Sequence, residues 1–304
     1  MSTAAMPAQP VTILALIEQM AARLEAAGLS FSDGFGQGTT NAFDEAAWLV
    51  LWQLGLPLDE LDEVENKAVA PADQAQLALL FDKRISSRLP AAYLTNEAWL
   101  MGVPFYVDER VIIPRSLIAE LLDDGSIDPW LSDETQRVLD LCTGNGSLAV
   151  LAAMTYPDVT VDAADISPDA LAVARINVDK HQLASRITLI ESDGLAACRG
   201  ADNGGYDLIL CNPPYVNATS MAALPAEFRA EPDLALAGGI DGMDFVRSLF
   251  LNVAAQMNEN AVLVLEIGHE RANFERAFPH LEPLWFETSA GSDQVMLLTR
   301  EQLA

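Results

Sequence analysis

Residues Tyr206 to Val216 read Tyr-Asp-Leu-Ile-Leu-Cys-Asn-Pro-Pro-Tyr-Val and give the clearest indication of the fold class. Its first half is a short apolar run, which is typical of a strand buried on both faces of a sheet. The run ends at Asn-Pro-Pro-Tyr, where two consecutive prolines remove two N–H donors and hold the preceding backbone extended. We therefore expect a rigid loop at the carboxyl end of a buried strand, where open α/β sheets bind their ligands.

The chemistry of this loop suits a particular kind of ligand. The side-chain oxygen of Asn212 and the carbonyl oxygen of Pro213 are hydrogen-bond acceptors, and Tyr215 adds an aromatic ring. Two fixed acceptors beside a ring suit a planar group that carries an NH2, such as an amide or the amine of a nucleobase. A strand terminator with a packed tyrosine would have the same sequence, so these residues alone leave both interpretations open.

The chain from Arg137 onward alternates short apolar runs with segments of helical periodicity. This alternation predicts a mostly parallel sheet with helices on both faces. The last two apolar runs suit an antiparallel hairpin at the edge of the sheet. We predict strands at 138–141, 160–164, 187–190, 208–211, 261–267, 284–288 and 294–299, and helices at 147–155, 168–180 and 244–257.

The first part of the chain has a different pattern. Apolar residues recur at helical spacing over 11–27, 41–54 and 70–88, and glycine or proline follows each segment. We therefore expect a helical domain over residues 1–91, which contains no cluster of catalytic residue types. Residues 92–114 read as a β-hairpin linker with a Gly-Val-Pro turn, and residues 115–304 as the α/β domain, with Ser116 capping its first helix.

Composition and charge exclude several classes of protein. The chain has 304 residues, and its three cysteines are widely spread, which argues against a disulfide framework and favours a reducing cytosol. The three histidines lack ligand spacing, so we predict no metal. No apolar run approaches the roughly 18 residues that span a bilayer, and no basic segment opens the chain. We expect a cytoplasmic protein without signal peptide or membrane partner.

The net charge of −27 bears on the partners. Such a field repels nucleic-acid phosphates and attracts cationic partners. Solubility alone would also explain an acidic surface. The charge therefore disfavours a nucleic-acid substrate without identifying a basic protein as the partner.

Three more segments at the ends of predicted strands carry polar groups. Asp140 to Ser147 reads Asp-Leu-Cys-Thr-Gly-Asn-Gly-Ser, a glycine-containing turn ahead of a helix, whose N-terminus favours the negative end of a ligand. The three-glycine dinucleotide fingerprint is absent here. Asp165 follows the second strand, where a carboxylate can accept both ribose hydroxyls of a nucleoside. Asp193 follows the third strand and is suited to accept from an adenine amino group.

This set of residues resembles the class I S-adenosylmethionine-dependent methyltransferases, whose fold is a Rossmann-like, seven-stranded, mostly parallel sheet. The Asn-Pro-Pro-Tyr motif resembles that of the branch whose members methylate planar nitrogens, namely adenine N6, cytosine N4 or glutamine N5. Residues 105–120 and 231–244 resemble the protein-(glutamine-N5) methyltransferase family. Two mild departures are Leu117 in place of a proline, and Asn145-Gly146-Ser147 in place of Ser-Gly-Cys.

Within that family, Pro114-Arg115-Ser116 followed by Ile-Ala-Glu-Leu is similar to the branch that acts on the third protein of the large (50S) ribosomal subunit. The sister branch, which acts on peptide chain release factors, usually has Pro-Arg-Pro-Glu-Thr here. The resemblance therefore implies methyl transfer from S-adenosylmethionine to a glutamine N5 of this basic ribosomal protein, either free or in an assembling particle. The alternative substrate is a release-factor glutamine.

The resemblance also implies the site residues. The helical domain would recognise the substrate, Asp165 would bind the ribose and Asp193 the adenine. A DNA amino-methyltransferase and a non-catalytic assembly factor remain competing interpretations. The implied catalytic residues are Asn212, Pro213, Pro214 and Tyr215, and the implied cofactor-binding residues are Asp140, Thr143, Gly144, Asn145, Gly146, Asp165, Asp193 and Asn212.

Overall fold

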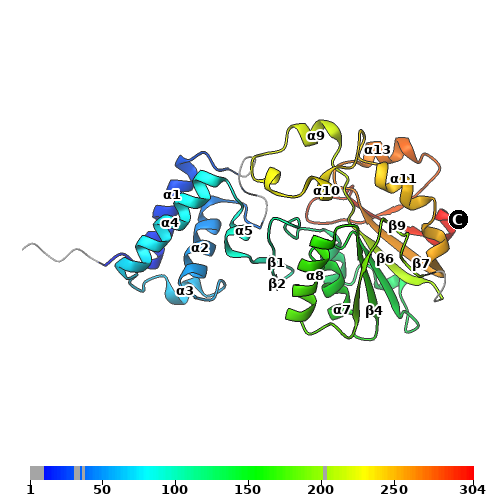
Figure 1. Cartoon of the computed structure of the whole chain (residues 1–304), viewed down its shortest axis with the longest axis horizontal. Helices are drawn as coiled ribbons and strands as arrows, with labels where there is room; N and C mark the ends of the chain where they lie inside the picture. Colours follow the sequence, from blue (N-terminus) through cyan, green and yellow to red (C-terminus); the bar gives the residue numbers. More distant parts are fainter. Residues whose placement is uncertain (1–9, 31–34, 36–37, 201–203) are drawn as a thin grey trace, which may run out of the picture. The chain divides into compact units, whose positions relative to one another are not determined.

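Seven strands form one twisted sheet in the C-terminal part of the chain (Figure 1). The computed structural model describes residues 10–30, 35, 38–200 and 204–304. The chain divides into two compact units: one comprises the described part of Met1–Thr95 with Pro225–Ala230, and the other comprises Asn96–Leu224 and Glu231–Ala304. The division falls at Thr95, so that residues 92–95 belong to the helical unit and the hairpin to the α/β unit.

The strand order of the large sheet is β5-β4-β3-β6-β7-β9-β8. The first five strands of this order run parallel, whereas β9 runs antiparallel to both β7 and β8. The predicted mostly parallel sheet with an antiparallel edge is therefore confirmed. The strands are β3 (Arg137–Leu141), β4 (Thr160–Asp165), β5 (Ile187–Glu191), β6 (Tyr206–Cys211), β7 (Met257–Glu266), β8 (Leu284–Trp285) and β9 (Val295–Thr299).

Strand β6 shows why this part of the chain folds as a buried strand. Leu208 and Leu210 belong to the apolar core on one face of the sheet, where α6 (Ile118–Asp123) and α7 (Ser147–Thr155) pack. Ile209 and Cys211 belong to the core on the other face, together with residues of α11 (Asp244–Phe250) and α13 (Arg271–Ala277). Because successive side chains point to opposite faces, a continuous apolar run fills both cores.

The remaining helices largely follow the predictions. Helix α8 (Pro168–Lys180) has the predicted range, whereas the single helix predicted at 244–257 is interrupted at Asn252, whose φ of −136° is not helical. This break separates α11 from α12. The other elements of the α/β unit are α9 (Ala218–Ala222), α10 (Asp233–Leu236), α12 (Val253–Gln256), α14 (Arg300–Leu303) and the 3-10 turn η1 (Asp128–Trp130). A second 3-10 turn, η3 (Phe228–Ala230), lies in the segment grouped with the helical unit.

The helical unit contains α1 (Ile13–Ala26), α2 (Ala42–Gln53), α3 (Leu61–Val64), α4 (Pro71–Ser87) and α5 (Ala91–Thr95). The three longer helices agree with the predicted segments, and their buried apolar side chains form one core. Thr12 and Asn41 cap α1 and α2 by accepting from backbone N–H groups. The short helices α3 and α5 were not predicted, because one turn is too brief to show a helical period. No helix in the described part of the chain has the length and apolar character needed to cross a membrane.

Two local predictions were wrong. The hairpin of β1 (Ala98–Leu100) and β2 (Val103–Phe105) turns at Met101-Gly102, both of which have positive φ, so Val103 and Pro104 lie in the strand. Ser116 is not the N-cap of α6, because that position is taken by Leu117. The Ser116 hydroxyl instead donates to the carboxylate of Glu266 at the end of β7.

Candidate active site

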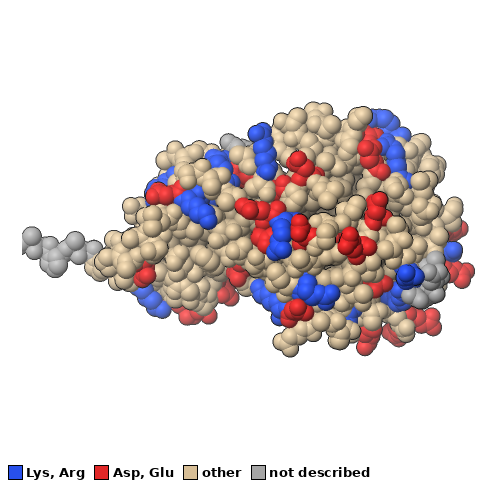
Figure 2. Space-filling view, viewed as in Figure 1, with Lys and Arg blue, Asp and Glu red and all other residues tan. Residues whose placement is uncertain are grey.

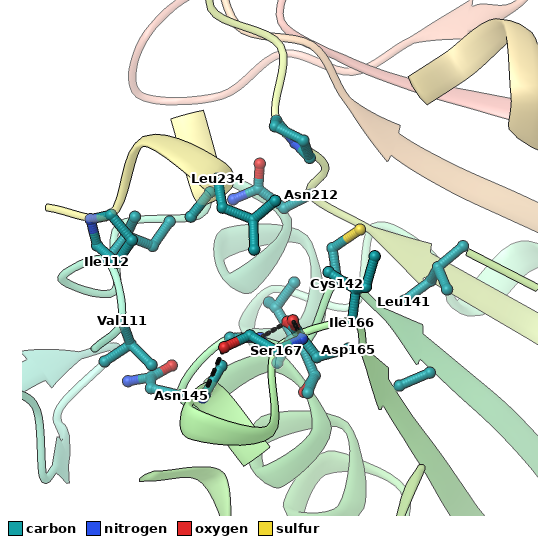
Figure 3. Close-up of a pocket in the computed structure, with 18 of the residues that line it drawn as sticks. Val111, Ile112, Leu141, Cys142, Asn145, Asp165, Ile166, Ser167, Asn212 and Leu234 are labelled. Carbon is teal, nitrogen blue, oxygen red and sulfur yellow. Dashed lines mark hydrogen bonds between the residues drawn. The ribbon is translucent and has the colours of Figure 1, made fainter. Parts of the chain in front are cut away.

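A cavity of about 340 Å³ opens at the carboxyl edge of the sheet (Figure 3). Because β3 lies between β4 and β6, the loops that follow these parallel strands meet at one edge. Six of the predicted cofactor-binding residues line the cavity: Thr143, Gly144, Asn145, Asp165, Asp193 and Asn212. Of the predicted catalytic residues, Asn212 and Pro214 line it, whereas Pro213 and Tyr215 lie outside the lining, as do Asp140 and Gly146.

The loop after β3 turns through three residues with positive φ, namely Cys142, Gly144 and Gly146. A side chain at Gly144 would meet nothing within 4 Å, so this glycine leaves its peptide open to a ligand. A Cβ at Gly146 would lie 3.1 Å from the Cβ of Ala174 in α8. Gly146 therefore allows close packing of two helices, which explains why it does not line the cavity.

Asp140 lies beneath this loop and is 1% exposed. Its Oδ2 accepts from the Thr143 hydroxyl and, over 3.0 Å, from the backbone N–H of Ala149 in α7. Burial raises the pKa of Asp140 to about 7, although these two hydrogen bonds oppose the rise. Through these two hydrogen bonds, Asp140 joins the loop after β3 to the first turn of α7.

Asp165 lines the cavity beside this loop. Its Oδ2 accepts from the backbone N–H of Gly144 and its Oδ1 from that of Ser167, each over 2.9 Å. Burial raises the pKa of Asp165, and both hydrogen bonds oppose the rise. Each carboxylate oxygen has a further lone pair, so Asp165 is able to accept a pair of hydroxyls. Asp193 lies exposed in the loop after β5.

Asn145 offers a donor to the cavity. Its Oδ1 accepts from the backbone N–H of Ser147 over 3.1 Å, while its Nδ2 is buried and has no hydrogen-bond partner within the described ranges. Figure 3 shows Asn145 beside Val111 at the cavity wall. A buried donor is costly unless it is paired, so this atom calls for an acceptor on a ligand. The carboxylate of a bound amino acid at this helix N-terminus would supply one.

The loop after β6 presents Asn212 to the cavity, near Leu234 of α10 (Figure 3). Tyr215 is held behind the loop: its hydroxyl donates to Glu266 Oε1 over 3.3 Å, and its ring packs against Gly268. A Cβ at Gly268 would lie 2.5 Å from Tyr215 Cε2, so only glycine fits there. Burial and the nearby Glu266 carboxylate raise the pKa of the Tyr215 hydroxyl well above its usual value. Tyr215 therefore stays protonated and anchors the loop.

Two buried glutamates that were not predicted hold the segment 113–117, part of which walls the cavity. Glu231 accepts from both Arg115 Nη atoms, over 2.5 and 2.7 Å, and from the backbone N–H of Ile113. Glu266 accepts from the Ser116 hydroxyl over 2.6 Å and from the Leu117 N–H over 2.9 Å. Glu266 had a signal in the sequence, since it ends an apolar strand as Asp165 does.

The family model of the methyltransferase small domain matches residues 119–259. The ribosomal protein uL3 glutamine methyltransferase of Bordetella pertussis is 51% identical over 294 residues, which cover 96% of either chain. The protein of the same name from Burkholderia pseudomallei is 49% identical over 298 residues, which cover 96% of this chain and 95% of the relative.

Solved structures agree on the fold. The catalytic domain of hMettl16 in complex with MAT2A 3′UTR hairpin 1 matches with a TM-score of 0.51 at 14% sequence identity, covering 78% of this chain and 83% of that one. The predicted class I methyltransferase fold is confirmed. The match to the methyltransferase family confirms the predicted cofactor, S-adenosylmethionine. On identity over nearly its whole length, the chain belongs to the family of the ribosomal protein uL3 glutamine methyltransferases.

Proposed function

We propose that this protein transfers the methyl group of S-adenosylmethionine to the side-chain N5 of a glutamine in ribosomal protein uL3. The observation that carries the proposal is one cavity that joins the Asn-Pro-Pro-Tyr loop to the loops after β3 and β4. The relatives that match nearly the whole chain are named for this reaction.

The cofactor contacts follow from the donors and acceptors at the wall. Asn145 Nδ2 would donate to the methionine carboxylate, Asp165 would accept the ribose hydroxyls, and Asp193 would accept from the adenine amine. Thr143 and Gly144 would shape the loop around the methionine end, with Asp140 and Gly146 supporting them from outside the cavity. When bound, the cofactor supplies an electrophilic methyl group on a sulfonium.

Asn212 would orient the glutamine. An amide nitrogen is a poor nucleophile, because its lone pair is shared with the carbonyl. The Asn212 side-chain oxygen would accept one of its two N–H bonds, which orients the NH2 and leaves electron density on nitrogen. The predicted second acceptor, the Pro213 carbonyl, belongs to a residue outside the cavity lining, so we do not assign it this contact. No strong base is needed beforehand, since the nitrogen becomes acidic as it is alkylated. Tyr215 does not line the cavity, so we assign it to holding this loop, in place of the predicted contact with the amide plane.

We base the proposed binding partners on the acidic charge of the chain. The helical unit would recognise the protein substrate, free or in an assembling particle, in the cytoplasm. Figure 2 shows acidic side chains spread over the visible face, and the chain carries a net charge of −27. Such a surface favours a basic protein and disfavours direct binding of nucleic acid or an acidic membrane.

The test uses labelled S-adenosylmethionine with purified uL3 and, separately, with release factors. We expect label on one glutamine of uL3 and none on release factors, mapped by mass spectrometry. The variant Asn212→Ala should keep cofactor binding and lose roughly 100-fold or more of its turnover, because orientation of the nucleophile is lost. Label on release factors alone would overturn the substrate, and undiminished turnover by the variant would overturn the role of Asn212.

A further inference from the structure

The segment Pro225–Ala230 packs with the helical unit, although the chain on both sides of it belongs to the α/β unit. It is the middle of a loop whose two ends are fixed in the α/β unit. At one end, Val216 exchanges backbone hydrogen bonds with Leu236 and Gly238, over 2.8 and 2.9 Å. At the other end, Glu231 pairs with Arg115.

Both ends of this loop adjoin the cavity wall. Asn212 and Pro214 line the cavity just before Val216, where the loop begins, and Pro232 and Leu234 line it just after Glu231, where the loop ends. Each end of the loop is therefore continuous along the chain with a segment of the cavity wall.

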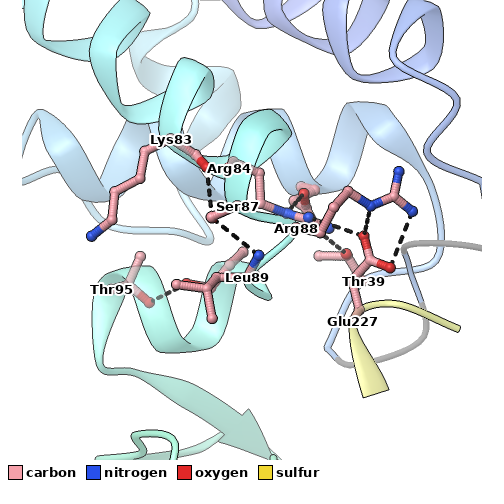
Figure 4. A network of polar contacts seen from close by, with 10 residues as sticks. Thr39, Lys83, Arg84, Ser87, Arg88, Leu89, Thr95 and Glu227 are labelled. Atoms are coloured by element: carbon pink, nitrogen blue, oxygen red, sulfur yellow. Dashed lines mark hydrogen bonds and ion pairs between the residues drawn. The ribbon is translucent and has the colours of Figure 1, made fainter. Parts of the chain in front are cut away.

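The middle of the loop is held by buried charges. Glu227 is fully buried; it lies 3.2 Å from Arg84 Nη1, and 2.6 and 3.1 Å from Arg88 Nε and Nη2 (Figure 4). Arg84 is also fully buried, and its Nε donates to Glu45 over 2.8 Å. Two arginines and two glutamates thus form a neutral cluster inside the helical unit. A buried carboxylate is strongly disfavoured without such partners, so Glu227 is stable in this buried position only because Arg84 and Arg88 lie beside it.

The attachment is mainly polar. In the described residues, the apolar core of the helical unit contains no side chain from 225–230. The ion pairs of Glu227 with Arg84 and Arg88 are buried side-chain attachments of this segment. An attachment of this kind is lost when one charged side chain is replaced, while the apolar core that folds the unit is left intact.

We propose that Glu227 is a positioning residue, which through Arg84 and Arg88 ties the loop after Asn-Pro-Pro-Tyr to the helical unit. These ion pairs thereby limit the movement of a loop whose two ends continue into the cavity wall. This inference rests on the proposed function, in that the substrate is a protein.

The first test is proteolysis of the full-length protein. Glu227→Ala should speed tryptic cleavage after Arg229, an exposed residue of the same segment, by roughly tenfold or more, because cleavage follows local opening. The matched control is Asp82→Asn, which removes an exposed ion pair with Arg23 in the same unit and should leave cleavage unchanged. If Glu227→Ala fails to fold, Glu227→Gln is measured instead. Cleavage no faster than in the control overturns the proposal.

The second test separates positioning from stability. Cofactor affinity by calorimetry should be unchanged in Glu227→Ala, while kcat/KM for uL3 falls about tenfold or more. Glu227→Gln keeps an acceptor for Arg88, so it should recover part of the kcat/KM and part of the protection of Arg229 from cleavage. A fall in kcat/KM with Arg229 still protected would overturn the proposal. If the wild-type protein does not methylate uL3, the proposed function fails, and the cleavage experiment still decides the attachment.

Discussion

The hydroxyl of Tyr215 donates to one oxygen of Glu266 over 3.3 Å, and the other oxygen of Glu266 accepts from Ser116 and from the backbone of Leu117. One buried carboxylate at the end of β7 thus joins the loop after β6 to the segment that leads into α6. Burial raises the pKa of Glu266, and the hydrogen bonds from Ser116, Leu117, Ile118 and Tyr215 oppose the rise. Glu266 therefore supports two segments beside the cavity, although it does not line the cavity itself.

Replacing Glu266 should lower both stability and turnover. Glu266→Ala leaves the Ser116 hydroxyl and the Leu117 N–H buried without an acceptor, so we expect a loss of about 2–3 kcal/mol in the free energy of unfolding. Glu266→Gln keeps an acceptor oxygen and should lose less. Denaturant unfolding measures the stability of both Glu266 variants, and an activity assay measures their turnover. Glu259→Ala, on the exposed part of β7, is the control. Equal stability of Glu266→Ala and the control would show that these hydrogen bonds contribute nothing.

Gly268 should be irreplaceable because of Tyr215. In Gly268→Ala the new methyl group would lie 2.5 Å from the Tyr215 ring, which must shift and carry the Asn-Pro-Pro-Tyr loop with it. Turnover should fall by roughly 100-fold, while cofactor affinity changes by less than about threefold. Gly55→Ala is a matched control: its φ of +65° resembles the +53° of Gly268, and nothing lies within 4 Å. Similar losses in both variants would point to backbone strain alone.

Asn145 should matter for the cofactor. Its buried Nδ2 would donate to a carboxylate, and a hydrogen bond to a charged group is worth about 1.5–3 kcal/mol, so Asn145→Ala should weaken S-adenosylmethionine binding by roughly 10- to 100-fold. Calorimetry with S-adenosylhomocysteine should show the same factor, since both ligands carry the methionine carboxylate. The exposed Asn66→Ala provides the control. Unchanged affinity in Asn145→Ala would remove Asn145 from the cofactor site.

Asp140 predicts how stability depends on pH. Its pKa is about 7 in the folded protein against an ordinary value of 3.8, so between these values the native state binds more protons than the unfolded state. The contribution of Asp140 is therefore complete below about pH 4 and is lost as pH rises through 7, by at most about 4 kcal/mol. Asp140→Asn should become more stable relative to the wild type between pH 5 and 8, as measured by urea unfolding. A constant difference across this range would contradict the shift.

The sequence predicted the main elements because their signals are local. An apolar run such as Leu208–Cys211 is buried on both faces wherever it lies, and the helical periods of α1, α2 and α4 span several turns. Parallel strands also place their carboxyl ends at one edge, so the sequence predicts that Thr143, Asp165 and Asn212 lie at the same edge of the sheet. Elements of one turn, such as α3, carry no such signal.

The supporting contacts were not predictable, because they join residues far apart in the chain. Ser116 and Glu266 are 150 residues apart, and Arg84 and Glu227 are 143 residues apart, so no local pattern relates them. The sequence likewise showed Asp140 and Asp165 as two acids after two strands. Only the packing of α7 over the first loop buries one and leaves the other open to the cavity.

Local sequence patterns are sufficient to predict the fold class, the edge of the sheet at which the polar loops lie, and the hydrogen-bonding groups of the loop after β6. These follow from side-chain polarity and backbone freedom, which each residue carries wherever it stands. The three-dimensional contacts show which carboxylates line the cavity, which support the loops by hydrogen bonds, and that Pro225–Ala230 belongs with the helical unit. The reason is physical: burial and ion pairing depend on the neighbours that folding brings together, and these lie far away in sequence.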